Sequence, residues 1–177
     1  MSNQFASLAV EMGAGKAYVL PVSEIPFDSG LRAFCEANLC GNYNRNYACP
    51  PSVGSAQELI ERAKTYENAL VFQTVSALED SFDYEGMMEA AAKHNALTDK
   101  LYARIKQQYP SCLPLSAGGC SICERCAKIS GEPCRFPGKA ISSLEAYCVN
   151  VSTLAGLCDM KYINGVDTVT YFSAILY

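Results

Sequence analysis

Residues 69–75 read Ala-Leu-Val-Phe-Gln-Thr-Val, an apolar run of the length of one strand. Valine, phenylalanine and threonine favour extended backbone, so this composition predicts a buried strand in preference to a helix. A strand with so little polar character belongs in the interior of a sheet. We therefore expect it to be central, with the neighbouring segments arranged around it.

Helices are predicted on both sides of this strand. Ser55 and Glu58 form a capping box, and an apolar stripe follows it, so a helix should begin after Ser55. Residues 84–109 carry apolar side chains at helical spacing without an internal proline. Asp83 can cap this helix, the longest in the chain, and Pro110 ends it.

Three side chains of the long helix need an interpretation. Met87 and Met88 are expected to fill the core, since methionine adapts well to irregular apolar gaps. His94 is the single histidine of the chain, which excludes any site that needs two histidines. We expect it to be solvated or half-buried, with a structural role.

The remaining elements follow from composition and caps. Ser142 and Glu145 form a second capping box, which predicts a short helix, and residues 151–157 can form another. The structure of residues 5–12 stays open, because their apolar residues lack a sharp period. Further strands are predicted at residues 16–22, 112–116 and 166–176.

These elements predict a single α/β domain over residues 1–177, with a small mixed sheet of about four strands covered by helices. Both cysteine-rich segments are expected in loops at one end of the sheet. An antiparallel α+β sandwich is the alternative arrangement.

Cysteine is the residue type that carries chemistry here. Residues 118–134 read Gly-Gly-Cys-Ser-Ile-Cys-Glu-Arg-Cys-Ala-Lys-Ile-Ser-Gly-Glu-Pro-Cys, a C-x2-C-x2-C-x7-C run. Its first two spacings match those of bacterial ferredoxins, whose thiolates each bind one iron of a cluster. The sequence therefore predicts a [4Fe–4S] cluster on four ligands: Cys120, Cys123, Cys126 and Cys134.

Zinc is the alternative metal, because four thiolates also suit a tetrahedral zinc site. Zinc ribbons usually join two separate C-x2-C pairs, whereas this run places three cysteines within seven residues. Disulfides are disfavoured. The first residues show no basic stretch that leads into an apolar core, so we expect no signal peptide, a cytoplasmic protein and reduced thiols.

A second cysteine group precedes the first in the chain. Cys35, Cys40 and Cys49 follow a looser C-x4-C-x8-C pattern that ends in Cys-Pro-Pro. Three cysteines within fifteen residues favour a second metal site. Cys112, Cys148 and Cys158 are isolated and are expected in the core, although Cys148 or Cys158 can supply a missing ligand.

Taken in chain order, the three-cysteine group, the four-cysteine run and the following Ser143-Leu-Glu-Ala resemble the DUF2284 family of predicted metal-binding proteins. The resemblance covers the chain from about Lys16 to Tyr177. It implies that all seven cysteines of the two groups take part in metal binding, and it names no reaction. The family usually has Gly-Ile-Asp-Val where this chain has Cys148-Val-Asn-Val, which leaves a ligand role for Cys148 open.

Charge and hydropathy exclude several classes of protein. A net charge of −4 opposes binding to nucleic acid, and no apolar run is long enough to cross a membrane. No phosphate-binding glycine loop, nucleophile elbow or HExxH motif is present.

Three functions remain after these exclusions. The first is an iron–sulfur protein with one or two [4Fe–4S] clusters that transfers electrons, either to a redox partner protein or to a small-molecule substrate. The second is an enzyme, or a metal- or cluster-delivery factor, that acts at the three-cysteine site. The third is a zinc-stabilised interaction module.

Overall fold

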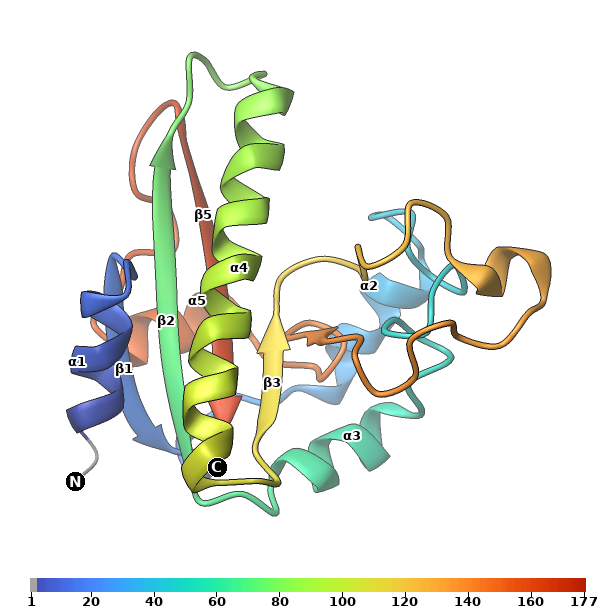
Figure 1. The fold of residues 1–177 in the computed structure, drawn as a ribbon, viewed down its shortest axis with the longest axis horizontal. Helices are drawn as coiled ribbons and strands as arrows, with labels where there is room; N and C mark the ends of the chain where they lie inside the picture. The colour runs from blue at the N-terminus through green and yellow to red at the C-terminus, as the bar shows by residue number, and fades with distance from the viewer. Residues whose placement is uncertain (1–2) are drawn as a thin grey trace.

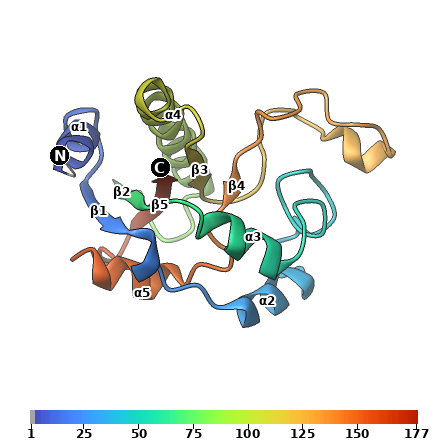
Figure 2. The same cartoon turned by 90° about the horizontal axis from the view of Figure 1, so that it is seen from below.

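The computed structural model describes residues 3–177. It is an α/β fold with helices on both faces of a five-stranded mixed sheet (Figure 1, Figure 2). The elements in chain order are α1 (Asn3–Glu11), β1 (Lys16–Pro21), α2 (Arg32–Glu36), α3 (Ala56–Ala63), β2 (Asn68–Ala77), α4 (Tyr84–Gln108), β3 (Leu113–Ser116), β4 (Ser142–Ser143), α5 (Val151–Leu157) and β5 (Thr168–Leu176). Three short 3-10 helices are Val22–Glu24, Ser29–Leu31 and Ala127–Ser130.

The sheet has the strand order β1-β2-β5-β3-β4. The first three pairings are antiparallel, and β3 and β4 are parallel. The prediction that residues 69–75 form an interior strand is confirmed, because β2 lies between β1 and β5. About four strands were expected, and the additional one is the two-residue β4.

Alternate residues of β2 contribute to two separate hydrophobic cores. Leu70 and Phe72 pack with α1 and α4 on one face of the sheet, whereas Ala69 and Val71 pack with α3 and α5 on the other. A strand's side chains point alternately to its two faces, so a strand covered on both faces must be apolar throughout. Figure 2 shows α1 and α4 on one side of the sheet and α3 and α5 on the other.

The predicted helix caps are confirmed for the two helices that flank β2. In α3 the Ser55 side chain accepts a hydrogen bond from the Glu58 N–H, while the Glu58 carboxylate accepts one from the Ser55 N–H. In α4 the Asp83 carboxylate accepts from the Gly86 N–H. These bonds satisfy N–H groups that have no partner within the helix.

The second capping box was a wrong prediction. No helix begins at Ser142, because Ser142–Ser143 forms β4 and the Leu144 N–H donates to the carbonyl of Ser116. These backbone groups are used by the sheet and are therefore not free to start a helix. The Ser143 hydroxyl accepts from the Ala146 N–H within the turn that follows.

Two expectations for side chains of α4 were also wrong. Met88 is 54% exposed and fills no core. His94 is 1% exposed, and its ring contacts both β2 and β5, with Nδ1 2.8 Å from the Thr74 hydroxyl and Nε2 2.7 Å from that of Ser173. Two hydroxyl partners explain how an imidazole can be buried without an unsatisfied nitrogen.

Candidate metal centre

The cysteine-rich segments lie on the side of the sheet where β3 and β4 are found (Figure 1, Figure 2). One comprises α2 and residues 37–54, and the other comprises residues 117–141, which contain only a 3-10 helix of regular structure. Both views show them side by side beyond β3, away from α1 and β1 (Figure 1, Figure 2). We call them the first and the second cysteine loop.

Glycines at left-handed positions shape the second cysteine loop. Gly118 has φ 75° and Gly131, which follows the 3-10 helix Ala127–Ser130, has φ 72°. Side chains rarely adopt this backbone conformation, so both turns favour glycine. The Arg135 guanidinium donates to the carbonyl of Arg125 at 3.0 Å and closes the loop behind its cysteines.

All four cysteines of the C-x2-C-x2-C-x7-C run line one small cavity in the second cysteine loop. Burial raises the pKa of the Cys120 thiol, and the other three thiols of the run raise it further. The four thiols therefore lie around this one cavity. Tyr47 of the first cysteine loop and Phe136 help to enclose the cavity.

This cavity has a volume of about 10 Å³, the space that one water molecule needs. Within residues 3–177, no three His, Cys, Asp or Glu side chains are close enough together to bind one metal ion. Four thiols suit a thiophilic metal chemically, so the donor set fits. In size the cavity matches a single ion, and a four-iron core requires this loop to open.

Cys148 lies near the start of the first cysteine loop, where the Arg32 guanidinium donates to the carbonyl of Ala146 at 3.0 Å. Burial raises the pKa of the Cys35 thiol, Arg32 lowers it, and the thiols of Cys40, Cys148 and Cys49 raise it again. Cys148 is completely buried and has φ 58°. Because this conformation favours glycine, a cysteine here costs the fold about 1 kcal/mol of backbone strain.

The other two isolated cysteines lie in the hydrophobic cores, as expected. Cys158 packs in the core with α3 and α5, and burial raises its pKa to about 12. Cys112 packs in the core with α1 and α4, and burial raises its pKa as well. Both residues are therefore part of the hydrophobic cores and not of a cysteine group.

The two cysteine loops contact each other directly. The Tyr47 hydroxyl donates to the carbonyl of Glu132 at 2.6 Å, and the Lys128 ammonium lies 5.1 Å from the centre of the Tyr47 ring. Gly119 packs so closely that a Cβ would lie 2.7 Å from Asn42 Oδ1.

The cysteine groups also meet at this contact. Burial is the main cause that raises the pKa of Cys49, and Cys40 and Cys120 raise it further. The two cysteine groups are therefore near enough for the Cys120 thiol to influence the pKa of Cys49.

A family model described as a predicted metal-binding protein, DUF2284, matches residues 18–177. The chain belongs to this family. The matched range contains both cysteine loops and every strand except the first two residues of β1. The resemblance indicated by the order of the cysteine motifs is therefore confirmed over nearly the whole chain.

Comparisons of this DUF2284 protein with curated proteins and with solved structures found no match. Among residues 3–177, no helix combines the length and the apolar character needed to cross a membrane. The family description supports metal binding and names neither a metal nor a reaction.

Proposed function

We propose that this protein binds an iron–sulfur cluster on Cys120, Cys123, Cys126 and Cys134 and transfers electrons in the cytoplasm. The observation that carries the proposal is the single cavity lined by these four thiols. Successive spacings of three residues let a short loop surround a cuboidal core, as in bacterial ferredoxins. A bound cluster of this kind supplies one-electron chemistry at a potential set by its surroundings.

We propose a second centre on the first cysteine loop. Its ligands are Cys35, Cys40 and Cys49, and the position of Cys148 supports it as the fourth. The direct contacts between the two cysteine loops make the two centres neighbours, which favours electron exchange between them over separate structural roles. A fourth cysteine closes this site, which weakens the alternative of an enzyme with an open coordination position.

Protein purified without oxygen is expected to contain iron and acid-labile sulfide and to show broad visible absorption. Stoichiometric zinc without sulfide would contradict the iron–sulfur proposal. The small cavity favours zinc as the second candidate, since a single ion needs less room than a cluster. Protein purified in air does not separate the two metals, because thiolates released by an oxidised cluster accept other thiophilic metals.

Cys148→Gly and Cys148→Ala are expected to lose the metal of the second centre and to keep that of the four-cysteine centre. The glycine variant should be the more stable of the two by about 1 kcal/mol, because only glycine relieves the left-handed backbone. Metal analysis and urea unfolding measure the two effects separately. Full metal content in both variants would show that Cys148 is not a ligand. The second centre would then be a three-cysteine site with an open coordination position.

A further inference from the structure

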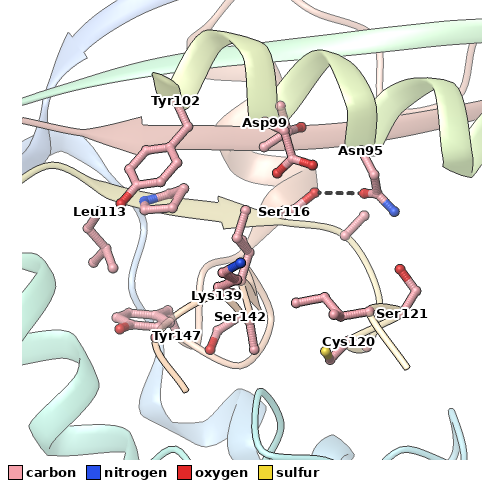
Figure 3. Close-up of a pocket in the computed structure, with 18 of the residues that line it drawn as sticks. Asn95, Asp99, Tyr102, Leu113, Ser116, Cys120, Ser121, Lys139, Ser142 and Tyr147 are labelled. Atoms are coloured by element: carbon pink, nitrogen blue, oxygen red, sulfur yellow. Dashed lines mark hydrogen bonds between the residues drawn. The ribbon is translucent and has the colours of Figure 1, made fainter. Parts of the chain in front are cut away.

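A second, much larger cavity lies beside the four-cysteine group. Its volume is about 750 Å³, within the range of roughly 300–1,000 Å³ that is typical of small-molecule sites. α4, β3 and the end of the second cysteine loop form its walls. In Figure 3, Asn95, Asp99 and Tyr102 extend from α4 toward this cavity, opposite Ser142 and Tyr147.

The cavity is positively charged although the chain is acidic. Arg62, Lys106 and Lys139 line it, and Asp99 is the one carboxylate among the lining residues. The charges of these four side chains sum to +2, whereas the whole chain carries −4. Within residues 3–177, no carboxylate forms an ion pair with any of the three cations. A concave surface lined by cations that have no carboxylate partner attracts anions.

The cations and the cysteine group lie toward opposite ends of the cavity. Arg62 and Lys106 belong to the last turns of α3 and α4, which converge where β3 begins, since the Tyr66 hydroxyl donates to the carbonyl of Ser111 at 2.8 Å. Cys120 follows the other end of β3. Cys120 lines both this cavity and the small four-cysteine cavity, so the two share a wall.

The wall between these ends is polar and well ordered. The Ser116 hydroxyl donates to Asn95 Oδ1 at 3.3 Å and accepts from the Ser173 hydroxyl at 2.9 Å, which in turn contacts His94. This chain of hydrogen bonds fixes the orientation of Ser116 and Asn95 from the core outward. A cavity held in this way is preformed, which lowers the entropic cost of binding.

We propose that this cavity binds a small organic acid, a carboxylate or a phosphate ester. Arg62 and Lys106 hold the acidic group, and the rest of the molecule extends along β3 to Cys120. Binding depends only on this chain's own side chains. That the ligand thereby reaches a redox centre rests on the proposed function.

The test uses four ring compounds of similar size: benzoate, phenyl phosphate, benzyl alcohol and benzylamine. Titrations followed by NMR should show binding of the two acids, weakened by added salt, and little or no binding of the alcohol and the amine. The amide signals of Tyr102 and Ser121 should shift on binding. Comparison of benzoate with phenyl phosphate shows which acid the cavity prefers.

The double variant Arg62→Gln/Lys106→Gln should weaken binding of the acids by about tenfold, since each exposed charge contributes modestly. The matched control is Lys64→Gln/Lys100→Gln, which removes the same charge from exposed lysines outside the cavity. The proposal would be overturned if both double variants weakened binding of the acids equally or if benzylamine bound as tightly as the acids. It would also be overturned if neither acid bound. Should the double variant misfold, the single variant Lys106→Gln takes its place.

Titrations on protein with and without iron keep the two proposals apart. Acid binding to a protein that takes up only zinc would leave the cavity proposal standing and end the iron–sulfur proposal. A protein that contains iron and sulfide but binds neither acid would support the iron–sulfur proposal and end the cavity proposal.

Discussion

Replacing Cys123 by serine is expected to abolish iron and sulfide binding at the four-cysteine centre and to loosen residues 118–137. Metal binding contributes to the folding free energy of a loop that has little packing of its own. Residues 117–141 contain a single 3-10 helix and bury few side chains, Ala127 among them. Metal analysis and limited proteolysis measure the two effects, and we expect cleavage within this loop only.

Cys158→Ala is the matched control for this experiment. It also removes a thiol, but from the hydrophobic core, where the sulfur contacts no other cysteine group. This variant should keep full metal content and lose stability by about 1 kcal/mol. A Cys123→Ser protein with full metal content and an uncut loop would show that Cys123 is not a ligand.

Acid is expected to destabilise the fold through His94 by roughly 3 kcal/mol. Burial lowers the pKa of His94 from 6.5 to about 4, and a bond with the backbone of Phe172 raises it slightly. Below pH 6.5, and down to about pH 4, His94 binds a proton in the unfolded chain but not in the folded chain. The contribution of neutral His94 to the free energy of unfolding is therefore fully present above pH 6.5. It is lost as the pH is lowered to about 4, at about 1.4 kcal/mol per pKa unit.

Two measurements check this prediction. Urea unfolding between pH 7 and pH 4 should show the loss in the natural chain and a flatter profile in His94→Gln, whose amide can still bond to the neighbouring hydroxyls. His94 is the only histidine, so its ring proton gives one NMR signal that titrates independently of metal loss. A signal that titrates near pH 6.5 in the folded protein would contradict the prediction.

Sequence reasoning succeeded where local chemistry decides the structure. The apolar run at residues 69–75, the Ser55 capping box and the Asp83 cap each specify an element through nearby atoms. At Ser142 the same kind of signal failed. There the competing partner was β3, whose pairing depends on the whole sheet and leaves no mark in the sequence around Ser142.

The site was predictable in part for similar reasons. Spacing alone grouped Cys120, Cys123 and Cys126, since residues so close in the chain cannot lie far apart. Cys148 follows Cys35 by more than one hundred residues, and only its place at a usual glycine position hinted at a special role. The large cavity gave no sequence signal, because its cations come from separate elements.

None of the seven cysteines in the two predicted motifs belongs to either hydrophobic core. We therefore expect the sheet and its helices to fold without metal, and this expectation sets the order of events during biogenesis. We expect the chain to fold first and to receive its metal afterwards. If the proposed cluster is present, a protein that loses it to oxygen is expected to keep its scaffold and to be repaired by reloading, without being degraded and synthesised again.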